Sequence, residues 1–150
     1  MSFTIRAAVE ADQATITSIV HAARINPRSL HWQRFMVAEV QGQIIGLRQV
    51  KIHKNGTREV ASGVVLSEYR RQGISAQLMD ALLAREHDVL YLMCDEKRSP
   101  YYQRFGFQRV PPTELPADFR REYRLGRIIT TILSLFIGRK LRIIPMKREP

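Results

Sequence analysis

Apolar and polar residues alternate along several short stretches of the chain, as they do in β-strands that bury one face. The alternation and the β-type composition predict strands over residues 3–7, 35–40, 44–53 and 58–66. Asn55-Gly56, which separates the last two stretches, is a strong signal for a tight hairpin turn. The last three of these strands are therefore expected to form an antiparallel meander.

The period of the pattern changes at Ile74. From there to Leu82 apolar residues recur at helical spacing, which predicts a helix over residues 74–87. A nearly continuous apolar run over residues 89–94 follows and is typical of a central, buried strand. The order strand, helix, strand favours a crossover connection between two parallel strands.

The remaining elements follow from capping and turn residues. Asp12 is expected to cap a helix that ends before Pro27, and Ser99-Pro100 to begin a short helix. We expect further strands over residues 107–110 and 141–146, and a helical segment over about 115–138, in two pieces that separate near Gly126. The prediction is a single domain of residues 1–150, an α/β (α+β) fold with a mixed, largely antiparallel central sheet flanked by helices.

The net charge of +10 is high for 150 residues. It favours acidic partners such as phosphorylated cofactors, anionic lipid or nucleic acid. Nine of the Lys and Arg residues lie between Arg120 and Pro150, where only Glu122 and Glu149 oppose them. The C-terminal segment is therefore much more basic than the rest of the chain.

The basic segment over residues 120–148 has three interpretations. It can be a solvated helix face. It can instead make a weak contact with an anionic membrane, because its apolar residues share one side of the predicted helix. These are Leu125, Ile129, Ile132, Leu133 and Phe136. Nucleic acid is the least favoured partner, since few aromatic residues are interleaved with the charges.

Three features of the sequence bear on the cellular compartment of the protein. Cys94 is the single cysteine, so no internal disulfide can form, and a core position is favoured over a nucleophilic role. The N-terminus lacks the apolar run of a signal peptide. The longest apolar stretch, residues 128–137, is about half the length of a membrane span. We therefore expect a soluble, cytoplasmic protein without a transmembrane span, and the spacing of the four histidines indicates no metal site.

The turn over residues 70–76 joins a strand to a helix and carries two arginines. The first amides of a helix have no intrahelical partner, and the helix dipole places partial positive charge there. Gly73 permits positive φ and the close approach of a ligand to the backbone. The turn is therefore a candidate site for a phosphate or pyrophosphate, and the alternative is an ordinary turn with solvated arginines.

Two motifs occur together in this chain: Arg70-x-x-Gly73-x-Ser75, and the segment from Tyr101 to Phe107, in which a tyrosine stands four residues before Gly-Phe. They resemble two signatures of the GNAT N-acetyltransferase superfamily, the first of which is Q/R-x-x-G-x-G/A. The resemblance covers most of the chain and implies a GNAT-like fold and acetyl-CoA as co-substrate. It also implies contacts to the cofactor from Gly63, Val64, Val65, Arg70, Arg71, Gln72, Gly73, Ile74, Ser75 and Ala76. Ser75 departs from the Gly or Ala of the signature.

The same resemblance implies that Tyr102 is the general acid of a direct transfer to a primary amine. A tyrosine hydroxyl is protonated at neutral pH and can donate to a departing thiolate; Tyr102 can otherwise be a packing residue. Met93 occupies the strand position where some members of the superfamily carry a glutamate. The sequence therefore does not identify the general base. Glu39, Glu59 and Glu68 are candidates acting through water, although each is more simply a solvated carboxylate at the end of a strand.

The expected acceptor is a small-molecule or peptide amine, and the protein is expected to be a monomer or homodimer. The alternative is a CoA-binding regulatory or interaction module with weak catalysis, whose basic C-terminal segment docks on an anionic membrane or a partner. Ser75 and Met93 favour this alternative.

Overall fold

The computed structural model describes residues 2–150, and its contacts divide the chain into two compact units. The first contains the residues up to Lys51 and Val60–His87, and the second contains Ile52–Glu59 and Asp88–Pro150. Strand β4 (Arg58–Val65) has residues in both units. The strands form one sheet in the order β1-β2-β3-β4-β5-β7-β6.

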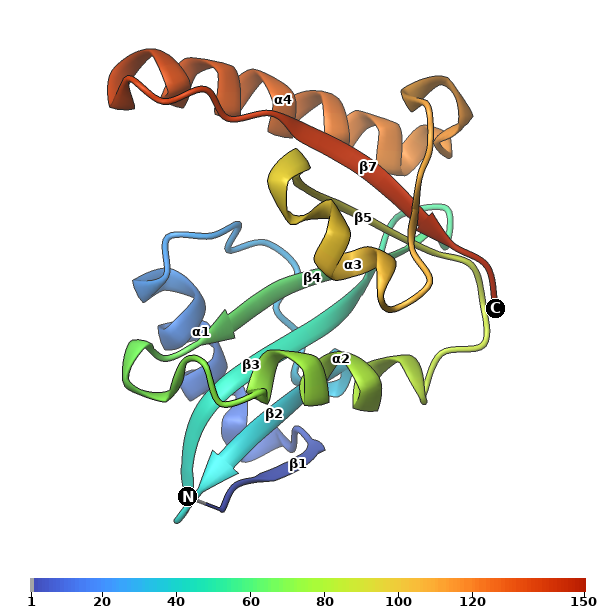
Figure 1. Ribbon diagram of the computed structural model, residues 1–150. Helices are drawn as coiled ribbons and strands as arrows, with labels where there is room; N and C mark the ends of the chain where they lie inside the picture. Colours follow the sequence, from blue (N-terminus) through green and yellow to red (C-terminus); the bar gives the residue numbers. More distant parts are fainter. Residues whose placement is uncertain (1) are drawn as a thin grey trace. The chain divides into compact units, whose positions relative to one another are not determined.

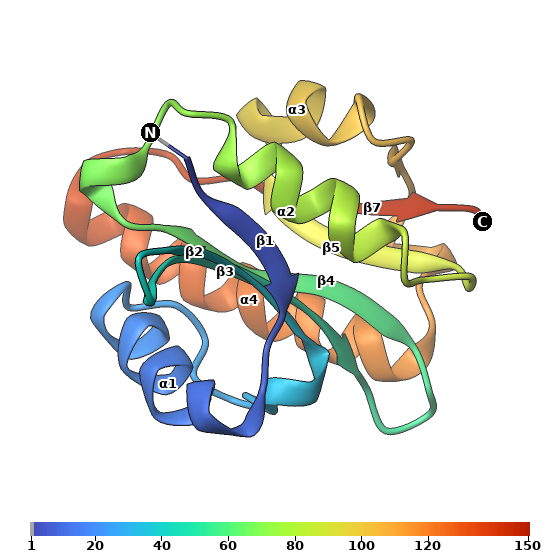
Figure 2. The same ribbon diagram turned by 90° about the horizontal axis from the view of Figure 1, so that it is seen from below.

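The first unit begins with an antiparallel ladder (Figure 1). Its strands before β4 are β1 (Thr4–Ala7), β2 (Phe35–Val40) and β3 (Gln43–Ile52), the last of which ends in the second unit. Its helices, α1 (Gln13–Ala22) and α2 (Ile74–Leu83), lie on opposite faces of these strands (Figure 2). The predicted meander is confirmed, whereas α2 ends four residues before the predicted His87.

Alternating residues of β3 contact the two helices. Leu47 belongs to the buried cluster that includes Ile16 and Val20 of α1. A side chain at Gly46 would lie 3.1 Å from the Ile74 side chain, so this glycine lets α2 approach the other face closely. The two-residue period therefore gives β3 one core face for each helix.

The second unit contains the rest of the sheet. Its further elements are β5 (Leu90–Asp95), α3 (Ser99–Gln103), β6 (Gln108–Arg109), α4 (Ala117–Ile137) and β7 (Ile143–Arg148). β4 and β5 pair in parallel, and β7 pairs antiparallel with both β5 and β6. The mixed, largely antiparallel sheet predicted above is thus confirmed, together with the parallel crossover. Figures 1 and 2 show α3 and α4 on opposite faces of β5 and β7.

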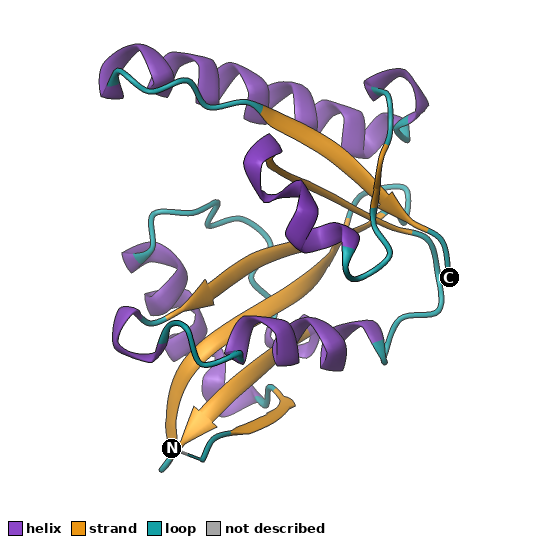
Figure 3. Ribbon diagram, viewed as in Figure 1, coloured by secondary structure: helices purple, strands orange, loops and turns teal. Residues whose placement is uncertain are grey.

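Helix α4 is one continuous helix of 21 residues, so the predicted separation near Gly126 is wrong (Figure 3). A Cβ at Gly126 would lie 3.2 Å from both the Ile143 side chain and the Met93 sulfur. The glycine therefore allows close packing of the helix on β5 and β7. Phe119 and Tyr123 are buried in the same interface. Among residues 2–150, no helix is long and apolar enough to cross a membrane.

Candidate functional site

The turn between β4 and α2 has an unusual backbone conformation. Arg71 has φ of 64° and Gly73 has φ of 78°, so the chain enters the left-handed region twice in three residues. Such turns direct successive backbone N–H groups into a common concavity. Gly73 is the N-cap of α2, as expected of a helix that begins directly at the turn.

The N-terminus of α2 is open. Its first intrahelical bond runs from the Gln77 amide to the Gly73 carbonyl at 3.1 Å, so the amides before Gln77 have no partner within the helix. Within the described residues, nothing lies within 4 Å of a Cβ built on Gly73. Arg70 and Arg71 are in the same turn, and Arg71 is exposed. The structure therefore brings the predicted residues 70–76 together around one positive helix terminus.

Arg48 of β3 lies beside this terminus and was not identified from the sequence. It is only 5% exposed, and Nη2 donates to the Ser75 hydroxyl at 3.3 Å. Its buried Nε has no hydrogen-bond partner. No acidic residue of the described chain forms an ion pair with it. A buried charge without a counterion is costly, and a positive helix end adds to the cost. The signal in the sequence is an arginine within the apolar stretch of residues 44–50.

Arg48 also explains why residue 63 is a glycine. A Cβ at Gly63 would lie 2.5 Å from Nη2 of Arg48, so the guanidinium packs directly on the backbone of β4. The preceding Ser62 has φ of 56°, and its hydroxyl accepts a hydrogen bond from Nε2 of the Gln49 side chain at 2.8 Å. Residues 63–65 thus follow a local irregularity in β4 and lead directly into the turn.

Tyr102 belongs to the second unit, on the short helix α3. It is buried, and its ring makes edge contacts with Tyr101 at 5.1 Å and Phe107 at 6.4 Å between ring centroids. Within residues 2–150, no hydrogen bond occupies its hydroxyl. The carbonyl of Tyr102 accepts from the Phe105 amide at 3.0 Å, which closes the turn at Gly106. Packing holds the ring, and no described residue occupies the hydroxyl.

The three candidate glutamates have different environments. Glu39 accepts from Nε of Arg6 at 2.7 Å. Glu59 is 7% exposed and lies 2.9 Å from Nε2 of His53. The expectation of a solvated carboxylate is therefore wrong for Glu59, because the hairpin folds His53 over it. Glu68 is exposed, and its pKa is lowered by hydrogen bonds from its own amide and from the Ser67 hydroxyl.

Cys94 is a core residue. Burial raises the pKa of its thiol to about 11, and its sulfur lies 3.7 Å from the sulfur of Met146. A thiol with such a pKa carries almost no thiolate at neutral pH, which argues against a nucleophilic role. In the part of the chain that the structure describes, no three His, Cys, Asp or Glu residues are arranged to hold a metal ion.

Solved structures share this fold over almost the whole chain. Similar structures include N-acetylglutamate synthase from Neisseria gonorrhoeae, in complex with coenzyme A and N-acetyl-glutamate (TM-score 0.73, 18% identity, 99% of this chain and 35% of that one). A Mycobacterium tuberculosis protein in complex with CoA is similar over 98% of this chain and 99% of its own (TM-score 0.70, 21% identity). A Salmonella typhimurium protein with its cofactor acetyl-CoA is similar over 99% and 94% (TM-score 0.61, 19% identity).

Sequence comparisons identify the family. An uncharacterised N-acetyltransferase of Chlorobaculum tepidum is 28% identical over 97 residues. The match spans 61% of each of the two chains, and this chain spans about a third of the Neisseria synthase. The model of the acetyltransferase (GNAT) domain matches residues 31–109, which include the turn between β4 and α2 and also Tyr102. This chain therefore belongs to the GNAT acetyltransferase family.

Proposed function

We propose that this protein transfers an acetyl group from acetyl-CoA to a primary amine. One observation carries the proposal: the buried guanidinium of Arg48 lies beside the open helix N-terminus, at the turn that resembles the family signature. Together they provide positive charge and backbone N–H groups, and Nε of Arg48 has no described hydrogen-bond partner. The pyrophosphate of CoA is an anion of suitable charge for such a site.

The cofactor contacts follow from this arrangement. The turn amides would bind the pyrophosphate, and the backbone of β4 before the turn would pair with the pantetheine arm as an added strand does. The first group contains Arg71, Gln72, Gly73, Ile74, Ser75 and Ala76, and the second contains Gly63, Val64 and Val65. Arg70 would add its charge to the first group, because its amide already donates to the Ser67 carbonyl at 3.4 Å. The N–H groups of the second group also suit the thioester oxygen, on which negative charge develops.

In the proposed reaction the amine nitrogen attacks the thioester carbon. A C–N bond forms, the C–S bond breaks, and the departing sulfur takes a proton from the Tyr102 hydroxyl. The nitrogen releases its extra proton to water, and water then restores the proton of Tyr102. The role of Tyr102 is supported by the motif around it and by a hydroxyl that no described residue engages. The acceptor is a small-molecule or peptide amine.

A second candidate function is a CoA-binding module without turnover. Met93 favours it, because a thioether cannot accept the amine proton and its sulfur packs toward Gly126 of α4. Release of CoA thiol in the presence of a panel of amines distinguishes the two functions. Thiol release above the rate without protein supports the transferase, whereas binding without release supports the module.

Calorimetric titration with acetyl-CoA tests the cofactor site directly. We expect binding in the micromolar range that is retained with desulfo-CoA, which lacks the sulfur and the acetyl group but keeps the pantetheine arm. ATP, which has phosphates but no pantetheine arm, should bind much more weakly. If acetyl-CoA does not bind at millimolar concentration, the turn is only a connection between two elements and the proposal fails.

A further inference from the structure

The second half of α4 exposes a concentration of large apolar side chains. Eight of them, between 41% and 83% exposed, lie within 13 residues. They are Leu125, Ile128, Ile129, Ile132, Leu133, Leu135, Phe136 and Ile137. The rest of the described chain exposes two such residues, Val9 and Ile52. Contiguous apolar surface of this kind marks a site of interaction.

The exposed residues form one face of the helix. From Leu125 to Phe136 they recur at steps of three and four residues, which places them on the same side. Phe119 and Tyr123 are buried on a different side, against β5 and β7. The hydroxyl of Ser134 also points away from the apolar face, and it accepts a hydrogen bond from the Leu141 amide at 3.0 Å. Packing within this unit therefore leaves the apolar face unused.

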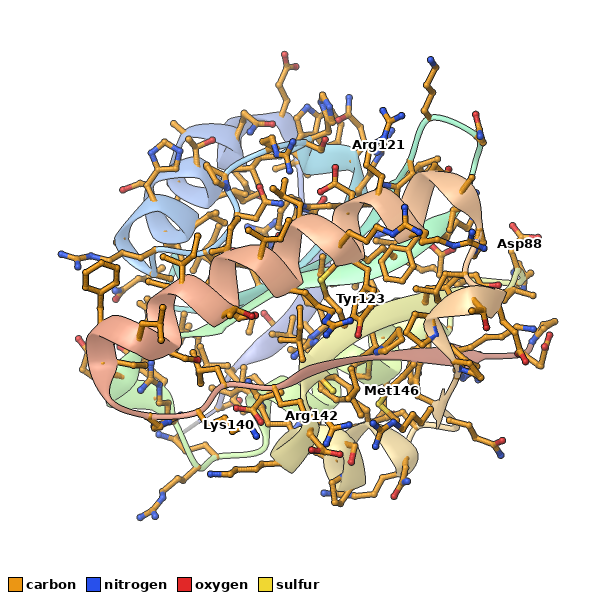
Figure 4. The ribbon with its side chains drawn as sticks, turned by 90° about the horizontal axis from the view of Figure 1, so that it is seen from above. Asp88, Arg121, Tyr123, Lys140, Arg142 and Met146 are labelled. Carbon is orange, nitrogen blue, oxygen red and sulfur yellow. The ribbon has the colours of Figure 1, made fainter. Side chains whose placement is uncertain are left out.

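Basic residues flank the apolar face at both ends. Arg121 and Arg124 precede Leu125 and Ile128 by four residues each and so continue the same side of the helix. Arg139 and Lys140 follow immediately after the helix, and no acidic residue occurs between Glu122 and Glu149. Figure 4 shows Arg121 near the beginning of α4 and Lys140 beyond its end.

A basic cavity of about 780 Å³ opens beside α4, between the helix and the segment that leads into β7. Its cationic lining residues are Arg109, Arg127, Lys140 and Arg142. Glu96 pairs with Arg109 at 2.8 Å and with Arg142 at 3.5 Å. Within residues 2–150, neither Arg127 nor Lys140 forms an ion pair. The cavity therefore keeps uncompensated positive charge next to the apolar helix.

We propose that α4 binds the surface of an anionic lipid bilayer, with its exposed apolar face in the interface and its flanking cations on lipid phosphates. An interfacial helix combines an apolar face with Lys and Arg at its borders, as α4 does. The helix lies in the plane of the membrane, since it is not long and apolar enough to cross it.

A second copy of the chain is a poorer occupant of the same face. A symmetric dimer places the same patch of both subunits in contact. The arginines at the two ends of each helix would then lie against those of the other copy, and the segment offers only Glu122 to offset them. Lipid phosphates complement the charge and fatty acyl chains cover the apolar side chains.

Vesicle flotation tests the proposal with the full chain. We expect binding to vesicles of phosphatidylcholine mixed with phosphatidylglycerol, and none to phosphatidylcholine alone. A basic protein also binds anionic vesicles by charge, so the decisive variant keeps every charge: Phe136→Ser combined with Leu135→Ser. Both side chains are at least 80% exposed, so the variant should fold as the wild type does. We expect its vesicle affinity to fall tenfold or more.

The matched control is Val9→Ser, which removes an exposed apolar side chain from another surface and should leave vesicle binding unchanged. Lys140→Gln should weaken binding, whereas Lys54→Gln, at the exposed hairpin tip, should not. Equal binding of the serine variant and the wild type would overturn the proposal, since charge alone would then account for the interaction. So would a wild-type dimer in light scattering that the serine variant abolishes, because the face would then belong to a second copy.

Discussion

At the scale of single residues, Arg48 is expected to lower the stability of the ligand-free protein. Its guanidinium is buried beside the positive end of α2, with a single described hydrogen bond to Ser75. Ser75 replaces the small residue of the family signature, and its hydroxyl accepts that hydrogen bond. In the proposed site, this hydrogen bond from Arg48 would hold the cation beside the pyrophosphate.

Replacing the buried cation of Arg48 should affect the stability of the protein and its affinity for acetyl-CoA differently. We expect Arg48→Met to leave the thermal stability of the ligand-free protein unchanged or to raise it, because an apolar side chain removes an uncompensated buried charge. The same change should weaken acetyl-CoA binding about tenfold or more, as loss of a charged hydrogen-bonding group does. Differential scanning fluorimetry and calorimetry measure the two effects. A destabilised variant with unchanged affinity would show that Arg48 is only structural.

Gly73 and Gly42 form a matched pair for testing the turn. Their φ values are 78° and 79°, and a Cβ at either would meet nothing within 4 Å. Aspartate at either position should therefore cost a similar amount, about 1 kcal/mol of stability. We expect Gly73→Asp to lose most acetyl-CoA affinity, because it places a negative charge at the proposed pyrophosphate. Gly42→Asp should bind as the wild type does, and equal affinity of both variants would contradict the proposed site.

The adjacent tyrosines allow a similar comparison. Tyr102→Phe removes a hydroxyl that no described residue engages, so the fold should be retained. If this hydroxyl protonates the departing thiolate, turnover should fall by about 10²- to 10⁴-fold while acetyl-CoA affinity stays nearly constant. Tyr101→Phe should have little effect on turnover. Thiol release with a responsive amine measures both, and unchanged turnover of Tyr102→Phe would exclude this residue as the acid.

At the scale of elements, Asp12 connects the beginning of α1 to the sheet. Its carboxylate accepts from Nη1 of Arg6 at 2.7 Å and from the Val9 amide at 2.8 Å, and Arg6 also pairs with Glu39 of β2. Asp12 stands before α1 as predicted, but its side chain makes no capping hydrogen bond to the helix. The arginine of β1 binds the carboxylate instead, and three elements are joined through one guanidinium.

This network predicts a pH-dependent stability difference. The hydrogen bonds from Arg6, and then that from Val9, hold the pKa of Asp12 below its ordinary value. A carboxyl group with a lowered folded-state pKa stabilises the protein above its unfolded pKa, and this stability is lost as pH falls through the folded value. We expect Asp12→Asn to lower the free energy of unfolding by about 1–3 kcal/mol at neutral pH.

The difference between wild type and Asp12→Asn should shrink as the pH falls below about 4, where the aspartate of the unfolded chain becomes protonated. Urea unfolding at a series of pH values measures it. Asp80→Asn is the control, since Asp80 is exposed on α2 and should give a small difference at every pH. A constant difference between wild type and Asp12→Asn down to strongly acidic pH would contradict the assignment.

At the scale of the whole molecule, the net charge of +10 is accompanied by two proposed anion sites. One is the turn of the first unit, with Arg48 as its buried member. The other is the border of α4 in the second unit, where the cations are exposed. Binding at the first depends on individual hydrogen bonds, while binding at the second depends on summed charge and should be the more sensitive to salt.

The sequence alone determined the features that depend on neighbouring residues. Alternation and helical spacing predict the meander, the crossover and most element boundaries, because periodicity reports which face of an element is buried. The turn over residues 70–76 is recognisable because its conformation depends on local residue types. The apolar face of α4 is likewise predicted by the helical spacing of its residues, although only the structure shows that this face is exposed.

Only the tertiary structure decided which distant residues meet. Arg48 reaches Ser75 across 27 positions, and Arg6 diverts Asp12 from capping a helix. Helix α4 continues through Gly126, where β5 and β7 bring Met93 and Ile143 against it. Glu59 is buried because His53 folds over it across the hairpin. Burial and pairing of polar groups depend on packing between elements, and a local pattern carries no information about the partner.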